Sequence, residues 1–307
     1  MKFAILFPGQ GSQYVGMGRD LYEQDPFRRR FLEADTILSF PLTELMLSGK
    51  EEELRRTANA QPAIFLVSYL LWEHFSREVG RRPTLMAGHS LGEYTALAAC
   101  GFFSFEDGMR IVRKRGSFME EACPSGKGGM VALIDPVMEL VEMEVQRKGA
   151  LLAIANRNAP DQVVVSGEME ALKELISGLR GRGYRRAIFL NVSGPFHSPY
   201  MKPAAERLEE ELRKIEPKRM EIPVVFNVDA EPFRDGEEVF EKLKRQLYSP
   251  VQWERSMRRM AEEGIELFIE LGPKNVLSNL ARKVLPHVET MNAERLVDVE
   301  RIKEALK

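Results

Sequence analysis

The residues best suited to chemistry stand in a short segment flanked by glycines, Gly88-His89-Ser90-Leu91-Gly92. A short apolar strand is predicted just before it, at residues 85–87, and an alanine-rich helix directly after it. A serine on such a sharp strand-to-helix turn presents its hydroxyl at the end of a sheet, where it can act as a nucleophile. The two glycines let the chain pack closely around the strained turn. The N–H of Leu91 would lie at a helix N-terminus and point at a developing oxyanion, so acyl transfer is the leading hypothesis.

A serine hydroxyl needs a base, and histidine is the usual base near neutral pH. Of the four histidines, His89 adjoins the serine, where neighbouring side chains diverge, and His74 ends an apolar helical segment and is expected to be structural. His197 lies in a loop stiffened by glycine and prolines directly after a predicted strand, a favoured place for catalytic groups. His287 comes late in the chain, as in the Ser, acid, His order of α/β-hydrolases. Local grounds favour His197, and His287 stays open as the alternative.

A charged substrate is suggested by Arg115, on the predicted helix that follows the elbow helix. Arginine suits a free carboxylate because its planar fork donates two parallel hydrogen bonds. A solvated basic face explains the neighbouring Arg113 and Lys114 at least as well. Helical periodicity alone does not separate Arg115 from that face.

Composition describes an ordinary globular chain of 307 residues, with 44% hydrophobic and 29% charged residues. The net charge of -2 gives no argument for a nucleic-acid or membrane partner. Residues 2–7 are predicted to form a buried first strand rather than a signal peptide, and no segment approaches the ~20 apolar residues that span a bilayer. Cys100 and Cys123 have neither a disulfide framework nor metal-ligand spacing. We therefore expect a cytoplasmic protein without a metal site.

Strand and helix patterns alternate along most of the chain, which predicts an α/β fold with a largely parallel sheet. The first strand ends in a loop rich in turn residues, Pro8-Gly9-Gln10-Gly11-Ser12-Gln13. A helix is predicted from Gln61 to Phe75, with Pro62 in its first turn. The residues Ser104-Phe105-Glu106-Asp107 resemble a capping box that opens the helix carrying Arg115.

The order of elements changes between residues 126 and 190. Strands are predicted at 130–134, 151–155, 163–165 and 186–190, and helices at 137–147 and 169–179. The order β-α-β-β-α-β matches the ferredoxin-like split unit. The sequence thus predicts a discontinuous large α/β domain, residues 1–125 and 191–307, with a small subdomain of residues 126–190 inserted into it. The chain returns to the large domain through strands at 224–226 and 267–269.

Several further motifs occur in a fixed order along the chain. They are Phe7-Pro8-Gly9-Gln10-Gly11-Ser12-Gln13, Gly88-His89-Ser90-Leu91-Gly92-Glu93-Tyr94, Arg115-Gly116, Asn156-Arg157-Asn158, Gln162-Val163-Val164-Val165-Ser166-Gly167, Phe196-His197-Ser198, Gln246-Leu247-Tyr248-Ser249-Pro250-Val251-Gln252-Trp253 and Glu270-Leu271-Gly272-Pro273. With these motifs the chain resembles, essentially end to end, the acyltransferase family of fatty-acid and polyketide synthesis that includes the malonyl-CoA:acyl carrier protein transacylases.

The resemblance implies a hydrolase-like α/β core with an inserted ferredoxin-like subdomain, and a ping-pong transfer. Ser90 would take the malonyl group from malonyl-CoA, with His197 as general base. The phosphopantetheine thiol of acyl carrier protein would then accept it. No permanently bound cofactor is implied, and a monomer is expected.

The resemblance also implies roles for individual residues. The backbone N–H groups of Gln10 and Leu91 would form the oxyanion hole, and Arg115 would bind the malonyl carboxylate. Gln246 would orient His197 through its backbone carbonyl. Asn156 and Asn158 match positions near the coenzyme A entrance. Phe196 before His197 resembles the malonyl-preferring pattern of the family.

Two other classes of function compete with this interpretation. A thioesterase or esterase would use Ser90 with a late histidine, but it leaves the loop of residues 7–13 and the inserted subdomain unexplained. A non-catalytic scaffold or carrier-binding module would require the serine turn to be vestigial.

Overall fold

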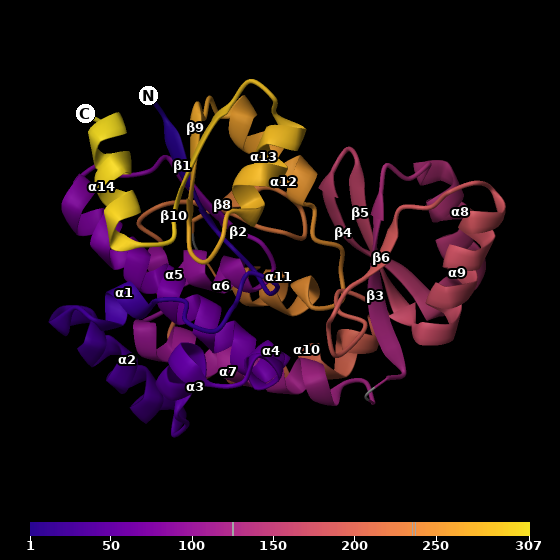
Figure 1. The fold of residues 1–307 in the computed structure, drawn as a ribbon, viewed down its shortest axis with the longest axis horizontal. Helices are drawn as coiled ribbons and strands as arrows, with labels where there is room; N and C mark the ends of the chain where they lie inside the picture. Colours follow the sequence, from indigo (N-terminus) through magenta and orange to yellow (C-terminus); the bar gives the residue numbers. More distant parts are fainter. Residues whose placement is uncertain (125, 235, 237) are drawn as a thin grey trace.

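The computed structural model describes residues 1–124, 126–234, 236 and 238–307, and in this part of the chain the strands form two sheets. The larger sheet has the order β10-β9-β1-β2-β7-β8 (Figure 1). Its strands are β1 (Phe3–Phe7), β2 (Leu85–Gly88), β7 (Val224–Val225), β8 (Pro232–Phe233), β9 (Leu267–Leu271) and β10 (Glu289–Ala293). All adjacent strands run parallel except β8, which is antiparallel to β7. The predicted α/β class is confirmed.

Strand β1 lies at the centre of this sheet and is buried on both faces. Phe3, Ile5 and Phe7 face the large hydrophobic core formed with α5 (Thr57–Val79). Ala4 and Leu6 face a second core on the opposite side, built with α12 (Trp253–Glu262) and α13 (Val276–Val284). A central parallel strand between two helical layers must be apolar at every position, which explains its unbroken hydrophobic run.

The other helices of the larger part flank the sheet and extend its lower layer (Figure 1). They are α1 (Arg19–Tyr22), α2 (Asp25–Leu38), α3 (Leu42–Ser48), α4 (Glu51–Arg55), α6 (Leu91–Ala99), α7 (Phe105–Glu121), α10 (Lys202–Leu212), α11 (Glu238–Gln246) and α14 (Leu296–Ala305). Ser104 caps α7 as predicted, with its hydroxyl accepting the N–H of Asp107 at 3.0 Å. Among the described residues, no helix combines the length and the apolar character needed to cross a membrane.

The smaller sheet, at the right in Figure 1, has the order β4-β5-β3-β6 and is antiparallel throughout. Its elements are β3 (Gly128–Ile134), α8 (Met138–Lys148), β4 (Leu152–Ala159), β5 (Gln162–Glu168), α9 (Met169–Gly181) and β6 (Ala187–Phe189). The predicted β-α-β-β-α-β order is present, and this strand order is that of a ferredoxin-like unit. Residue 125, at the expected boundary of the insertion, lies outside the described residues.

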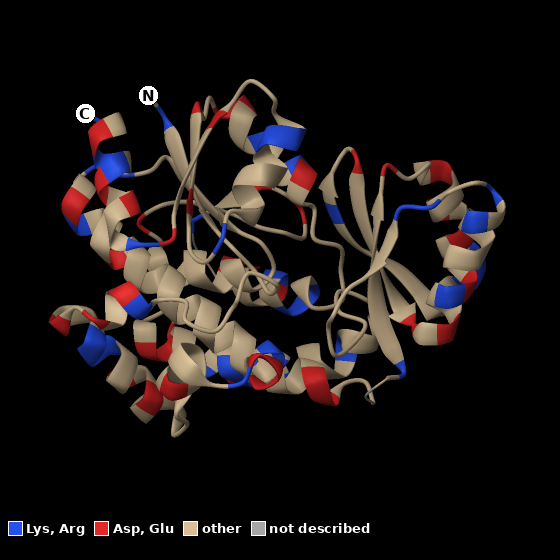
Figure 2. Ribbon diagram, in the orientation of Figure 1, with Lys and Arg blue, Asp and Glu red and all other residues tan. Residues whose placement is uncertain are grey.

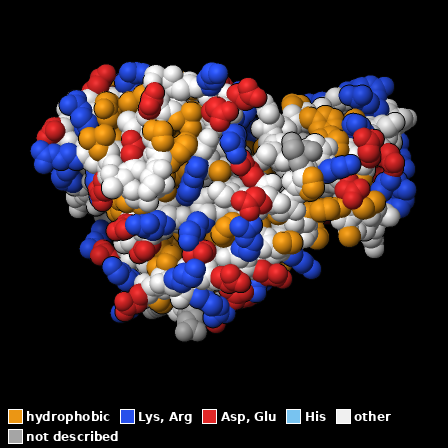
Figure 3. All heavy atoms as spheres, turned by 90° about the horizontal axis from the view of Figure 1, so that it is seen from below, with side chains coloured by type: hydrophobic (Ala, Val, Ile, Leu, Met, Phe, Trp, Pro, Cys, Tyr) orange, Lys and Arg blue, Asp and Glu red, His pale blue; other side chains and the backbone are white. Residues whose placement is uncertain are grey.

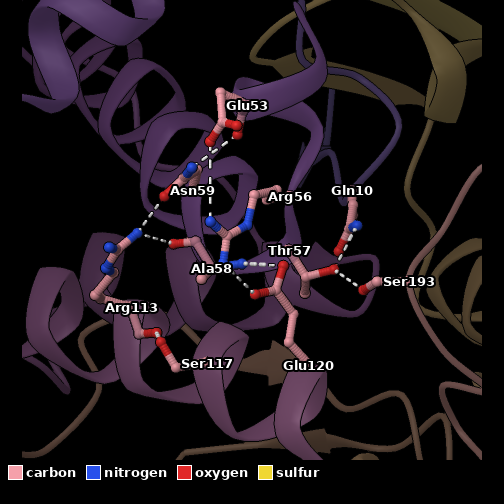
Figure 4. A network of polar contacts seen from close by, with 10 residues as sticks. All are labelled: Gln10, Glu53, Arg56, Thr57, Ala58, Asn59, Arg113, Ser117, Glu120 and Ser193. Atoms are coloured by element: carbon pink, nitrogen blue, oxygen red, sulfur yellow. Dashed lines mark hydrogen bonds and ion pairs between the residues drawn. The ribbon is translucent and has the colours of Figure 1, made fainter. Parts of the chain in front are cut away.

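Helix α5 corrects one expectation from the sequence. It begins at Thr57 rather than at Gln61, so Pro62 lies inside the helix and not in its first turn. Proline has no N–H, so the carbonyl of Ala58, four residues earlier, loses its helical donor. Arg113 fills that position by donating from Nη1 to the Ala58 carbonyl at 2.7 Å, a contact drawn in Figure 4. Arg113 is therefore half-buried and not part of a solvated basic face.

Surface charges of both signs are interspersed over the outer helices (Figure 2), and the face seen from below shows the same mixture (Figure 3). Many form pairs one helical turn apart, such as Arg29–Asp25, Arg110–Glu106 and Arg258–Glu254. Such exposed pairs each contribute only about 0.3–0.5 kcal/mol. The fold therefore depends on its apolar cores.

Helices α5 and α7 approach closely because two glycines of α7 face α5. A Cβ at Gly116 would lie 2.7 Å from the carbonyl oxygen of Thr57 and 2.8 Å from the Cα of Ala58. A Cβ at Gly108 would lie 2.4 Å from the ring of Phe65. The first contact is with backbone atoms, which cannot rotate away.

Gly116→Ala is therefore expected to lower the free energy of unfolding by about 1–3 kcal/mol through overpacking. Gly178→Ala is the matched control, because Gly178 is an exposed helical glycine of α9 with open space around it. That control should raise stability by up to about 1 kcal/mol, since alanine favours a helix more than glycine does. Urea unfolding of the two variants measures both effects. Equal stability of the two would contradict the close backbone contact.

Candidate active site

Ser90 stands between β2 and α6 in a backbone conformation with φ 50° and ψ -100°, which non-glycine residues rarely adopt. The flanking glycines make this turn possible. A Cβ at Gly88 would lie 1.9 Å from the carbonyl carbon of Gly92, and one at Gly92 would lie 2.0 Å from the carbonyl oxygen of Phe7. The elbow predicted from the sequence thus requires glycine at both positions for steric reasons.

His197 is the histidine that the fold brings to Ser90. Its Nε2 lies 2.8 Å from the Ser90 Oγ, and its Nδ1 lies 2.7 Å from the backbone carbonyl of Gln246. A carbonyl only accepts, so Nδ1 carries the proton and donates to it, and Nε2 is free to accept the serine proton. Burial and the positive charge of Arg115 lower the pKa of His197 to about 3, so the imidazole is neutral. The pair has the geometry of a nucleophile and its general base.

The other histidines lie elsewhere. His287 is exposed in the turn between α13 and β10 and lines a separate surface hollow with Met1 and Arg258. His74 packs edge-on against Phe27. His89 points away from the serine and contacts Asn158 and Trp253. The alternative based on a late histidine does not fit this arrangement.

Arg115 is fully buried beside the nucleophile. Its Nη2 donates to Ser90 Oγ at 3.1 Å and to Gln246 Oε1 at 2.9 Å, and its Nη1 donates to Gln61 Oε1 at 2.8 Å. The guanidinium also lies over the ring of Tyr94, 5.0 Å from its centroid. Burial lowers the pKa of Arg115. Among the described residues no carboxylate forms an ion pair with it, and its Nε has no acceptor.

Two backbone N–H groups point to an anion site next to the serine. Leu91 is the first residue of α6, and Gln10 lies in the loop after β1. Within the described residues neither N–H has an intramolecular acceptor, and both residues line the same cleft as Ser90. The loop is fixed from behind, because Gln10 Nε2 donates to Thr57 Oγ1 at 3.0 Å and Thr57 Oγ1 lies 3.0 Å from Ser193 Oγ (Figure 4).

A cleft with a cavity volume of about 260 Å³ leads to Ser90 between the two parts of the molecule. Its small-sheet wall includes Met130, Ala132 and Val164, and residues of α13 and of the loop after β1 also line it. Asn156 and Asn158 of β4 both line it, as does Phe196. The side-chain Oδ1 of Asn158 accepts from Nε2–H of His89 at 2.9 Å, so it also fixes the residue next to the nucleophile.

Three buried polar residues of the site were not found from the sequence. Asn227 accepts the Ser90 N–H on Oδ1 at 2.7 Å, Glu93 accepts the Asn227 N–H at 2.5 Å, and Gln61 contacts Arg115. Burial raises the pKa of Glu93 to about 8 against the opposing effects of the Asn227 N–H and Arg115. Asn227 directly follows a predicted strand of the parallel sheet, which is the one sequence signal that could have indicated it.

A strained serine, a neutral buried histidine, free amide donors and a buried cation at the mouth of a cleft define a serine acyl-transfer site. The comparisons with known proteins agree. The model of the acyl transferase domain family matches residues 4–304, so the chain belongs to that family.

Individual relatives cover nearly the whole chain. The chain is 47% identical over 295 residues to the malonyl CoA-acyl carrier protein transacylase of Bacillus subtilis (strain 168), covering 94% of this chain and 92% of that protein. It is 41% identical to the protein of the same name from Escherichia coli (strain K12), covering 96% of each. Among solved structures, the malonyl CoA-acyl carrier protein transacylase of Coxiella burnetii matches with a TM-score of 0.96 at 34% identity, covering 100% of this chain and 98% of that one. A malonyl-transacylase in complex with a type II PKS acyl-carrier protein matches with a TM-score of 0.96 at 36% identity, covering 99% and 100%.

The low pKa of His197 predicts how the reactivity of Ser90 responds to pH. With a pKa of about 3, the base stays neutral when the pH falls from 8 to 5, so labelling of Ser90 by an alkyl fluorophosphonate should change little over this range. A histidine at its ordinary pKa of 6.5 would instead lose about tenfold in rate per pH unit below that value. Labelling rates followed by intact mass spectrometry distinguish the two, and an inflection near pH 6.5 would contradict the buried, neutral imidazole.

Proposed function

We propose that this chain transfers the malonyl group from malonyl-CoA to the phosphopantetheine thiol of acyl carrier protein, for fatty-acid chain elongation. The observation that carries the proposal is the position of Arg115. A fully buried cation without a carboxylate partner among the described residues lies 3.1 Å from the nucleophile oxygen. Such a site favours an acyl group that brings its own negative charge, as malonyl does.

In the first half-reaction Ser90 Oγ attacks the thioester carbonyl carbon while His197 Nε2 takes the serine proton. The carbonyl oxygen becomes an oxyanion, and the N–H groups of Gln10 and Leu91 donate to it. The tetrahedral intermediate collapses with cleavage of the C–S bond. The leaving thiolate of coenzyme A receives the proton from His197, and a malonyl ester of Ser90 remains.

In the second half-reaction the phosphopantetheine thiol gives its proton to His197 Nε2 and attacks the ester carbonyl. The same two N–H groups stabilise the second oxyanion. The C–O bond breaks, and Ser90 Oγ recovers the proton from His197. Throughout, the Gln246 carbonyl accepts from Nδ1 and keeps the ring in the tautomer that both steps need.

The proposal divides the chain into a catalytic part, residues 1–125 and 191–307, and a small subdomain of residues 126–190 that supplies one wall of the cleft. Asn156 and Asn158 on that wall would contact the incoming pantetheine-bearing substrate. No resident cofactor is required, because the thioester provides the activation. We further propose that the chain acts as a monomer in the cytoplasm.

The acyl-enzyme is the direct test of this function. Mixing the protein with malonyl-CoA should add the mass of one malonyl group to wild type and none to Ser90→Ala. Slow loss of that group in buffer and fast loss to holo acyl carrier protein are expected, because the buried site disfavours water as acceptor. Repeated turnover that releases coenzyme A as fast without a carrier as with one would instead indicate a hydrolase. A folded wild-type protein that acquires no mass would indicate a non-catalytic carrier-binding module.

The role of Arg115 predicts a change in substrate preference. Arg115→Ala should reduce kcat/KM for malonyl-CoA about a hundredfold more than for acetyl-CoA, because only malonyl loses a charge-assisted contact of ~3 kcal/mol. Arg113→Ala is the matched control, since this half-buried arginine two residues away contacts the Ala58 carbonyl and Asn59 and not Ser90. It should leave the malonyl-to-acetyl ratio unchanged. Equal losses on both substrates in Arg115→Ala would remove the carboxylate-binding role.

A further inference from the structure

Glu93 is a fully buried carboxyl group directly beneath the nucleophile, in the first turn of α6. Its Oε2 accepts the backbone N–H of Asn227 at 2.5 Å, and its Oε1 accepts from Nε2 of Gln246 at 3.0 Å. Among the described residues it forms no ion pair, so it does not serve as the partner of a cation. A buried carboxyl group is costly to retain unless its acceptors are needed.

The first of its two contacts leads to the nucleophile. Asn227 is itself fully buried, and its side chain holds the elbow from both sides of Ser90. Its Oδ1 accepts the Ser90 N–H at 2.7 Å, and its Nδ2 donates to the Gly88 carbonyl at 2.8 Å. These bonds stabilise the unfavourable φ of Ser90, so the placement of Asn227 sets the direction of the hydroxyl.

The second contact leads to the base and the cation. Gln246 is fully buried, and its backbone carbonyl accepts from His197 while its Oε1 accepts from Arg115. Its Nε2 donates to the Ser90 carbonyl at 2.9 Å as well as to Glu93. Glu93 fixes which end of the amide faces inward, because its Oε1 accepts the hydrogen bond from Nε2 while its Oε2 is already occupied by the Asn227 N–H.

We propose that Glu93 is a positioning residue that holds Ser90, His197 and Arg115 in one rigid frame through Asn227 and Gln246. It touches none of the reacting atoms. The inference rests on the proposed function for its meaning in catalysis, but the geometry that it concerns can be tested without any acyl substrate.

The test uses Glu93→Gln in the full chain. This change keeps the size of the side chain but, because both Glu93 oxygens accept, it sets the new NH₂ group against a donor, either the Asn227 N–H or the Gln246 NH₂. The rate of Ser90 labelling by an alkyl fluorophosphonate should fall by about tenfold or more. With malonyl-CoA, kcat should fall by a similar factor while KM changes by less than about threefold. Because the phosphonate needs no malonyl group, loss of labelling would be seen even if the proposed substrate were wrong.

Glu270→Gln is the matched control for loss of a buried carboxylate. Glu270 is also fully buried and accepts from the Leu277 N–H and from Ser278, but it makes no hydrogen bond to the residues of the Glu93 frame. The Glu270→Gln substitution should lower Tm, while the labelling rate of Ser90 stays within about twofold of wild type. The downfield proton resonance of His197 Nδ1–H supplies a second readout. It should shift or broaden in Glu93→Gln and persist in Glu270→Gln.

Gln246→Met keeps the backbone carbonyl for His197 and removes the side-chain contact with Glu93. In the double variant Glu93→Gln/Gln246→Met, the labelling rate of Ser90 should be at most about threefold lower than in the slower of the two single variants. Both substitutions disrupt the same contact between Glu93 and Gln246, so their effects should not multiply. Multiplied losses would show that Glu93 acts independently of Gln246 and would overturn the proposal that it holds His197 and Arg115 through that residue. So would a labelling rate in Glu93→Gln within about twofold of wild type, measured below its Tm. If Glu93→Gln does not fold, Gln246→Met replaces it as the test. A Ser90 labelling rate within about twofold of wild type in folded Gln246→Met would then overturn the proposal.

Discussion

The close approach of the elbow to the end of β1 is the constraint on which the rest of the site depends. The Cα of Gly92 lies so near the carbonyl of Phe7 that no side chain fits between them. This contact places the N-terminus of α6 beside the loop that follows β1. Two residues from segments 81 positions apart, Gln10 and Leu91, therefore line the same cleft. The unfavourable backbone conformation of Ser90 is then stabilised by the hydrogen bonds of the Asn227 side chain, and not by an intrinsic preference of serine for that conformation.

Local sequence was sufficient for features that one turn or one strand defines. The elbow, the cap at Ser104 and the ferredoxin-like order of elements each follow from short-range patterns, and the structure contains all three. The predicted start of α5 is wrong, because proline is typical of a first helical turn but Pro62 lies inside this helix. Sequence did not reveal that Arg113, from another helix, supplies the missing hydrogen bond.

Features that depend on tertiary packing could not be predicted in the same way. The residues alone left His197 and His287 open, since only the fold shows which ring reaches Ser90. Arg115 could not be separated from its basic neighbours, because helical periodicity does not show that Arg115 is fully buried while Arg113 is half-buried and Lys114 is exposed. Glu93 and Asn227 are polar residues whose partners lie more than a hundred residues away along the chain. No local pattern encodes such pairs.

The insertion of the small sheet between the nucleophile and its base has a consequence for protein synthesis. Ser90 and His197 are separated by 107 residues, and Gln246, which orients the imidazole, follows 49 residues later. Strand β9, which pairs with β1, begins only at Leu267. A growing chain on the ribosome thus carries the Ser90 segment before His197, Gln246 and β9 have been made. The pair of nucleophile and base therefore cannot form before residue 197 has been synthesised, so the order of segments along the chain delays activation of the serine.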